Sequence, residues 1–113
     1  MTLRFANTAK ELKVAANAGS FQPLKTLYGS SAELIYEALL ILLQADNLND
    51  VMFFQKFRPH ALKGESKGKF SMSVGGRKRL IVMTRDSKGK TTKEIDFSAS
   101  YGLIVEVSEH YGD

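Results

Sequence analysis

Three short segments hold the side chains best suited to proton transfer or to binding a phosphate ester. They are His60-Ala-Leu-Lys63-Gly64-Glu-Ser-Lys67-Gly68-Lys69, Arg77-Lys78-Arg79 and Glu109-His110-Tyr111. Histidine accepts and donates protons near neutral pH, and lysine and arginine supply the positive charge that a phosphate requires. Glycine lets a backbone approach such a group closely. The residue types therefore indicate acid–base chemistry on a phosphate-containing ligand, or binding of one.

Positive charge is concentrated in the part of the chain that contains the first two segments. The 113 residues carry a formal net charge of +4. Between Lys56 and Lys93, twelve Lys and Arg residues face only Glu65 and Asp86, which gives this part +10 and leaves −6 for the rest. Such asymmetry is typical of a protein with a polyanionic partner, since phosphate contacts release counterions. A solvated basic face without a partner is the alternative.

Several kinds of chemistry are excluded by composition. The chain has no cysteine and two histidines, so we expect no disulfide, no thiolate nucleophile, no metal site and no cofactor. Residues 2–13 are too polar for a signal peptide. The longest apolar run, Ala38–Leu43, is far shorter than the ~20 residues of a membrane helix. We expect a soluble, cytoplasmic protein without membrane contact.

The N-terminal third is predicted to form a strand and a helix. Thr2–Ala6 alternates apolar and polar residues, which is typical of a strand. Thr8 and Glu11 have the spacing of a capping box, which predicts a helix that ends by Gly19.

A second, stronger helix is predicted after Ser30, which forms another capping-box pair with Glu33. An apolar stripe at helical period consists of Leu34, Ile35, Ala38, Leu39 and Leu42. Leu40, Ile41 and Leu43 extend the apolar surface around the helix, so we expect a second face to be covered, by the monomer itself or by a partner protein.

The remainder of the chain has the alternation and turn residues of strands. Strands are predicted at Phe53–Arg58, Lys69–Val74, Arg79–Thr84, Glu94–Phe97 and Leu103–Val107. Helices followed by a mainly antiparallel sheet predict an α+β fold, and residues 1–113 are expected to form one domain.

The hairpin around Gly75-Gly76 has a register that the apolar pattern can select. A three-residue loop, Gly75–Arg77, pairs Met72 with Leu80 and Phe70 with Val82, whereas a two-residue loop would place arginines beside these core residues. With the longer loop, Arg79 shares a polar face with Lys69, Ser71 and Ser73.

Two blocks of the sequence resemble a known family of bacterial toxins. The run His60-Ala-Leu-Lys63-Gly64, the Lys67-Gly68 pair, the strand 70–74 and Arg79-Leu80-Ile81 resemble the central block of HigB-type killer toxins in the RelE/ParE superfamily. The ending Ile104-Val-Glu-Val-Ser-Glu109-His110-Tyr111-Gly112 is similar to that branch's I-x-E-V-x-D-Y-H-G. The resemblance covers roughly residues 48–112.

The resemblance implies a RelE-like fold, with two N-terminal helices packed on a twisted, mainly antiparallel sheet. It also implies the toxin of a type II toxin–antitoxin system, an mRNA interferase that cuts messenger RNA on the ribosome. In that reaction a ribose 2′-hydroxyl attacks the adjacent phosphate, which needs a proton acceptor, a proton donor and positive charge but no metal. The implied partners are a cognate antitoxin, in a hetero-oligomer, and the messenger and ribosomal RNA of the ribosome.

Carried over by position, the catalytic candidates are His60, Lys63, Arg79 and Glu109, with glutamate in place of the family's aspartate. His110 and Tyr111 occupy the family's Tyr-His positions in reversed order. Because successive strand residues point to opposite faces, this exchange puts the arrangement of the terminal residues in doubt. The other basic residues of the first two segments are expected to bind RNA: Lys67, Lys69, Arg77 and Lys78.

Three functions remain open from the residues alone. The first is the endonuclease, the second a noncatalytic gyrase inhibitor of the ParE type, and the third a noncatalytic RNA-binding protein. His60 and the basic hairpin favour the first over the second, while the reversed His110-Tyr111 order favours the third. The aromatic residues Tyr101, Phe97 and Phe21 are predicted to pack in the protein rather than to stack on bases.

Overall fold

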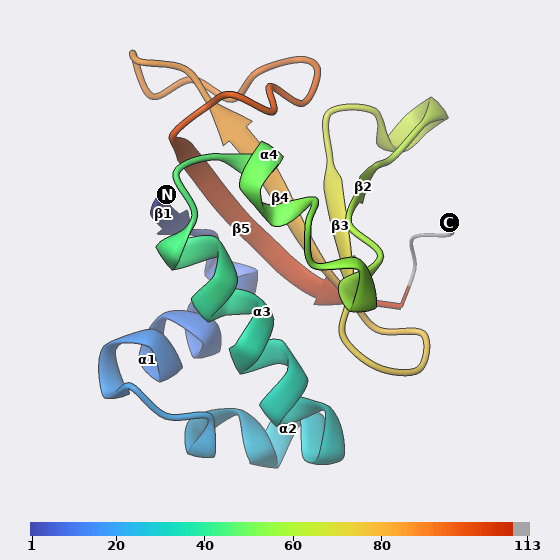
Figure 1. The fold of residues 1–113 in the computed structure, drawn as a ribbon. Coiled ribbons are helices and arrows are strands. Elements are labelled where there is room, and N and C mark those ends of the chain that lie inside the picture. The colour runs from blue at the N-terminus through green and yellow to red at the C-terminus, as the bar shows by residue number, and fades with distance from the viewer. Residues whose placement is uncertain (110–113) are drawn as a thin grey trace.

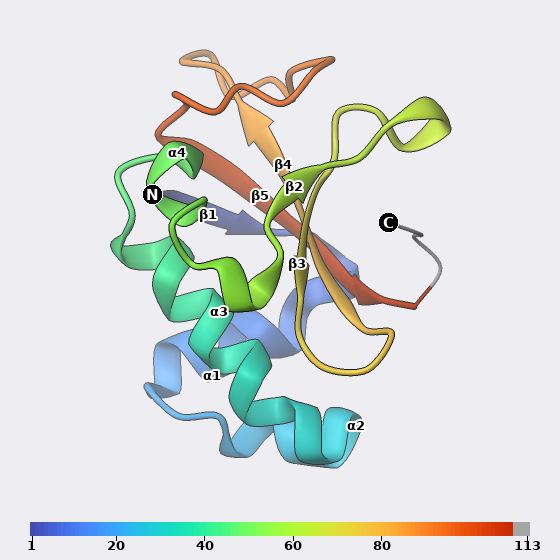
Figure 2. The ribbon, with the colours of Figure 1, turned by 45° about the vertical axis from the view of Figure 1, so that its right-hand side comes forward.

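The fold, seen in a computed structural model that describes residues 1–109, is α+β with a five-stranded mixed sheet (Figure 1). The strand order is β1-β5-β4-β3-β2; β1 lies parallel to β5 and every other neighbouring pair is antiparallel. The first strand therefore lies beside the last strand, at one edge of the sheet (Figure 2). The strands are β1 (Thr2–Phe5), β2 (His60–Ala61), β3 (Phe70–Ser73), β4 (Arg79–Arg85) and β5 (Tyr101–Ser108).

Two helices correspond to the predicted ones and two are single turns. The helices are α1 (Lys10–Ala18), α2 (Lys25–Tyr28), α3 (Ala32–Gln44) and α4 (Leu48–Val51). The end of α1 confirms its prediction, because Gly19 has a left-handed conformation (φ 64°) and its N–H bonds to carbonyl groups of the last turn.

Both predicted capping boxes are wrong. The side chain of Thr8 donates to the carbonyl of Val105 instead of capping α1, and no side chain caps α3. The physical reason is that 3₁₀ turns at Asn7–Ala9 and Gly29–Ser31 lead into these helices. Backbone N–H groups at the helix starts bond to carbonyls of those turns, so the side-chain caps are not needed.

The helices cover one face of the sheet, and the core lies between them (Figure 1). Sheet residues in this core share one orientation by register, and all are fully buried: Phe70, Met72, Leu80, Val82 and Ile104. From the helices, Leu12 of α1 and Ile35 and Leu39 of α3 pack against them. Ile81 is equally buried but lies outside this cluster, because its side chain points to the other face.

The predicted hairpin register is confirmed. Phe70 pairs with Val82 and Met72 with Leu80, while Val74 closes the three-residue loop through its N–H bond to the Lys78 carbonyl (3.0 Å). The apolar pattern selected this register because a slip of one residue would have moved Arg79 into the core.

Two predicted strands are absent from the described residues. Phe53–Arg58 is instead a 3₁₀ turn at Gln55–Phe57 that ends at Arg58 in a left-handed conformation (φ 44°), directly before Pro59. Residues Glu94–Phe97 form an irregular segment, which we call the crossing segment. The Asp96 carboxylate accepts the backbone N–H and the hydroxyl of Ser98 (3.0 and 2.7 Å), and these bonds turn the chain.

Among residues 1–109, only the stretch 22–44 is long and apolar enough, by length and composition alone, to cross a membrane. The stretch includes α2 and α3, and Ile35, Leu39 and Leu42 of α3 are fully buried in the core. Such burial is typical of the central helix of a globular protein. The expected second apolar face is largely covered within the monomer, since Leu40 and Ile41 are partly buried and only Leu43 is exposed.

Candidate functional site

Polar residues gather on the face of the sheet opposite the helices, which we call the helix-free face. Strand pairing places His60 opposite Ser71, and Arg79 between Ser73 and Ser108. Since directly paired residues share a face, these five side chains belong to one surface. From the strand spacing, His60 and Arg79 lie roughly 12 Å apart at their Cα atoms, with β3 between them.

The ring of His60 is oriented by its own loop. Its Nδ1 lies 2.7 Å from the carbonyl oxygen of Arg58. A carbonyl can only accept a hydrogen bond, so Nδ1 carries the proton and, in the neutral ring, Nε2 carries the lone pair. The left-handed conformation of Arg58 belongs to the same turn, and such backbone strain in a residue with a side chain is often found at functional sites.

Three polar members of this surface are buried: Ser71, Arg79 and Ser108. Arg79 is 7% exposed, and Ser71 is fully buried. The Ser71 hydroxyl has no hydrogen-bond partner among residues 1–109. Arginine and serine are rarely placed inside a protein without reason, because removing them from water costs free energy.

Lys78 and Glu109, both predicted site residues, meet at the end of the hairpin. The Lys78 ammonium lies 3.7 Å from a Glu109 carboxylate oxygen, and the Glu109 side chain is 60% exposed. The strand β5 ends at Ser108, so Glu109 follows directly after the residue paired with Arg79. His110 and Tyr111 lie outside the described residues. Arg77 is exposed at the tip of the hairpin loop.

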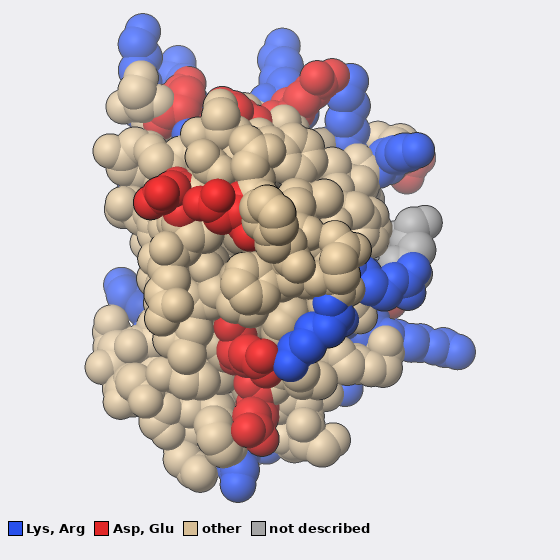
Figure 3. Space-filling view, viewed as in Figure 1, with Lys and Arg blue, Asp and Glu red and all other residues tan. Residues whose placement is uncertain are grey.

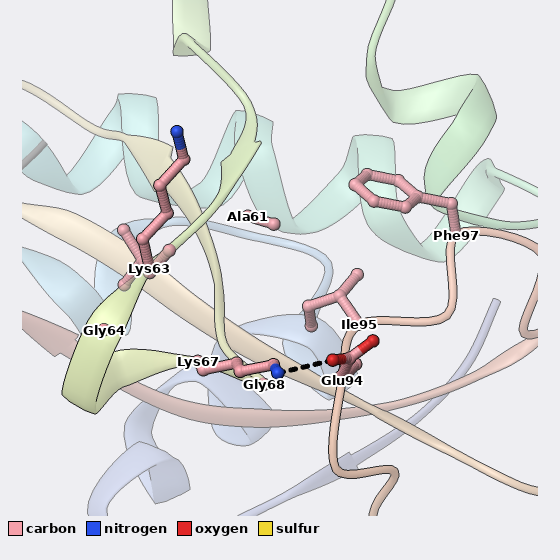
Figure 4. A pocket seen from close by; sticks show the side chains of 9 residues that line it. Ala61, Lys63, Gly64, Lys67, Gly68, Glu94, Ile95 and Phe97 are labelled. Carbon is pink, nitrogen blue, oxygen red and sulfur yellow. Dashed lines mark ion pairs between the residues drawn. The ribbon is translucent and has the colours of Figure 1, made fainter.

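The basic loop after β2 borders a separate hollow of about 330 Å³ (Figure 4). Lys63 and Lys67 line it from one side, and Glu94, Ile95 and Phe97 line it from the crossing segment. Phe97 also packs edge-on against Phe70, with 6.0 Å between the ring centres, which confirms its predicted packing role. The hollow therefore adjoins the helix side of the sheet and not the helix-free face.

Gly68 is the residue that lets this loop close against the crossing segment. It has φ +93°, and a Cβ atom there would lie 2.7 Å from the Lys93 carbonyl oxygen. Lys67, beside it, forms an ion pair with Glu94 at 2.5 Å. The hydrogen bond from Lys67, together with its charge, lowers the pKa of Glu94 below the ordinary value of 4.5. One of the predicted RNA-binding lysines thus has an acidic partner within the chain.

Basic side chains project from the upper and right-hand edges of the molecule in Figure 3, and acidic side chains lie both among them at the top and across the middle of that view. The structure accordingly divides the predicted site residues into two groups. His60 and Arg79 lie on the helix-free face, and Lys63 and Lys67 lie around the hollow of Figure 4. Lys69, the last lysine of the loop, is half-buried just before β3.

Two residues near the predicted site residues were not identified from the sequence. Ser108 pairs with Arg79, and its position directly before Glu109 in the terminal block was the available signal. Glu94 pairs with Lys67 across 27 residues of chain, and no local pattern could have shown it.

Tyr101 was predicted to pack in the protein, and this is wrong, because it is 47% exposed. Its register places it on the helix-free face, opposite Arg85 of β4.

Among the described residues, no group of three or more histidine, aspartate or glutamate side chains is arranged to hold a metal ion. The chain matches none of the known protein-family models. No curated protein is significantly similar to it in sequence.

Proposed function

We propose that this protein is a RelE-like toxin of the HigB type, an endoribonuclease that cuts messenger RNA on the ribosome. The observation that carries the proposal is the placement of His60 and Arg79 on one polar face, two strands apart, with Ser71 between them. These are two of the residues that the family resemblance assigns to catalysis. The α+β fold, with α1 and α3 packed on one face of the sheet, is compatible with it.

The chemistry follows from what these groups can do. The ribose 2′-oxygen attacks the adjacent phosphorus, the bond to the 5′-oxygen breaks, and a cyclic phosphate and a 5′-hydroxyl result. His60 Nε2 can take the proton of the 2′-hydroxyl, because Nδ1 is bonded to the Arg58 carbonyl. Arg79 offsets the negative charge that develops on the phosphate oxygens. The leaving oxygen needs a proton donor, a role we assign to the terminal residues Glu109–Tyr111.

Cytoplasmic location and partners belong to the same proposal. A ribosomal substrate requires the protein to reach the cytoplasm, and the cluster of lysines and arginines suits a surface surrounded by RNA phosphates. An antitoxin encoded by an adjacent gene would bind the toxin in a hetero-oligomer and neutralise it.

Induced expression in a bacterium, with mapping of messenger RNA 5′ ends, tests the proposal. Wild-type protein should arrest growth and produce new ends inside translated codons. His60→Ala should remove those ends, since general acid–base catalysis contributes about 10²- to 10⁴-fold in rate. His110→Ala is the matched comparison, because it shows whether the second histidine shares the proton transfer. Circular dichroism of both variants controls for folding.

The outcomes separate the alternatives. Growth arrest without RNA cuts, together with loss of supercoiling by DNA gyrase, would reject the endonuclease and favour a ParE-type gyrase inhibitor. RNA binding without arrest or cuts would leave a noncatalytic RNA-binding protein. Cuts that persist in a folded His60→Ala variant would keep the endonuclease and reject the role of His60.

A further inference from the structure

A second hollow, of about 390 Å³, lies at the far end of the sheet from His60 and Arg79. Residues from β1, β5 and the end of β4 line it, and we call it the Tyr101 hollow. Strand pairing places Thr2, Tyr101 and Arg85 in one row across three strands, with Arg4 two positions further along β1. Its members are Thr2, Arg4, Arg85, Asp86, Ser87, Gly89, Tyr101 and Gly102.

The aromatic residue of this hollow is exposed where a packing role would bury it. Tyr101 is 47% exposed, in contrast to the buried aromatic residues Phe57 and Phe70. An exposed ring on a sheet surface, flanked by arginines, is the arrangement on which unpaired bases stack.

The guanidinium group of Arg85 is held in place by the turn that follows β4. Its Nε and Nη2 both donate to the Gly89 carbonyl oxygen, the former at 2.8 Å. Gly89 has φ +80°, and a Cβ atom there would lie 3.2 Å from Nη2, so glycine permits this close approach. The remaining N–H groups of Arg85 can serve another acceptor, since a guanidinium carries five.

Positive charge prevails in the hollow. Among residues 1–109, neither Arg4 nor Arg85 forms an ion pair. The one carboxylate of the lining, Asp86, accepts the backbone N–H groups of Lys88 and Lys90 through Oδ1, at 2.9 Å each. The hollow therefore contains two guanidinium groups and a single carboxylate, which already accepts hydrogen bonds from the backbone of its own turn.

We propose that the Tyr101 hollow binds an unpaired nucleotide of single-stranded RNA, with the base stacked on Tyr101 and the phosphate held by Arg4 and Arg85. The identity of the polyanion as RNA rests on the proposed function. The hollow and the catalytic residues are separated along β4 by about 20 Å, so one nucleotide cannot reach both. Half-buried Met83 and Leu103 lie between them on the same face. The helix-free face thus forms a track for a strand of several nucleotides.

Fluorescence anisotropy with a short labelled single-stranded RNA tests this site. Methylation of every 2′-oxygen removes the nucleophile, so binding is measured apart from cleavage. Tyr101→Ala should weaken binding on the order of 10-fold, as expected for one lost stacking contact, and Tyr101→Phe should retain it. Phe53→Ala is the matched control, because it removes an aromatic ring that is 83% exposed elsewhere. A duplex of the same sequence should compete poorly, since its bases are already stacked.

The charge component has its own measurement. Arg4→Gln should lower the slope of log affinity against log salt concentration by about 0.7, the value for one phosphate contact on a single strand. Lys13→Gln, an exposed change on α1, should leave the slope unchanged. Equal binding by wild type and Tyr101→Ala, or equal losses in Tyr101→Ala and Phe53→Ala, would overturn the site.

Failure of this inference and failure of the proposed function give different results. Wild-type protein that cuts messenger RNA, while Tyr101→Ala binds RNA normally, would reject the Tyr101 hollow alone. Wild-type protein that cuts nothing, while Tyr101→Ala loses RNA binding, would keep the hollow and reject the endonuclease.

Discussion

Both faces of the central strands are partly buried, but the residues buried on the two faces differ in polarity. On the helix side, Phe70, Leu80 and Val82 are fully buried in an apolar cluster. On the helix-free face, their polar chain neighbours Ser71 and Arg79 are buried as well, beside the apolar Ile81. Strand alternation alone produces this division, because one sequence supplies both surfaces at a period of two.

The difference shows which face serves stability and which is available for function. Burial of apolar side chains is the main favourable term in folding. Burial of a hydroxyl without a partner, as for Ser71, opposes folding. Natural proteins tolerate such local costs mainly where binding or catalysis requires them. The predictions below test this division, starting with the largest expected effect.

On the helix side, Phe70→Ala should destabilise the protein by about 3–5 kcal/mol, through lost burial and the cavity left behind. Phe70 is fully buried and also supports Phe97. Urea unfolding followed by circular dichroism measures the change. Phe53→Ala, at an exposed ring, is the control and should cost less than about 0.5 kcal/mol. Equal losses in the two variants would show that the helix side is not the stabilising face.

At the border of the helix side, Gly68→Ala should cost at least about 2 kcal/mol, because the new methyl group meets the Lys93 carbonyl in a left-handed backbone. Gly76→Ala provides the comparison, since Gly76 also has a positive φ (57°) but no atom within 4 Å of the added carbon. Its cost should be about 1 kcal/mol. Equal free energies of unfolding for the two variants would mean that the crossing segment shifts to accommodate the methyl group at no cost in stability.

On the helix-free face, Ser71→Ala should leave the free energy of unfolding unchanged or raise it by up to about 1 kcal/mol, because a buried hydroxyl without a bond is removed. Ser73→Ala, at a half-buried position of the same strand and face, should have no measurable effect. Urea unfolding of both variants beside wild type decides the point. A clear loss of stability in Ser71→Ala would assign that hydroxyl a structural role.

The smallest effect concerns the pH dependence of the Lys67–Glu94 pair. Since the folded pKa of Glu94 is lowered, the pair stabilises the fold above the ordinary pKa of 4.5, and this stabilisation is lost as pH falls through the folded value. The urea midpoints of wild type and Glu94→Gln should therefore differ slightly at neutral pH and converge as the pH falls through the lowered pKa of Glu94. A difference that persists in acid would have another cause.

Local patterns were sufficient where the chain bonds to itself over short distances. The hairpin register was predicted correctly, because Phe70, Met72 and Leu80 allow only one pairing with a buried face. The two capping boxes failed for a physical reason that spacing does not reveal. Preceding 3₁₀ turns already bond the helix N–H groups, and Thr8 finds a carbonyl of β5, 97 residues away.

The candidate site was predicted as a set of residues but not as an arrangement. The sequence named His60, Arg79 and the lysines of the basic loop together. In the folded chain, Lys63 and Lys67 instead line the hollow of Figure 4, where Lys67 meets Glu94. The exposure of Tyr101 was likewise decided by its register, which places it on the helix-free face opposite Arg85.

The sequence by itself determined the α+β class, the two main helices, the hairpin and the concentration of positive charge, because each depends on residue type and periodicity within a short stretch. Only the tertiary structure decided the parallel contact of β1 with β5, the sides on which the basic residues lie, and the hollow at Tyr101. These features join segments up to about a hundred residues apart, and the balance of burial and pairing that selects them belongs to the whole fold.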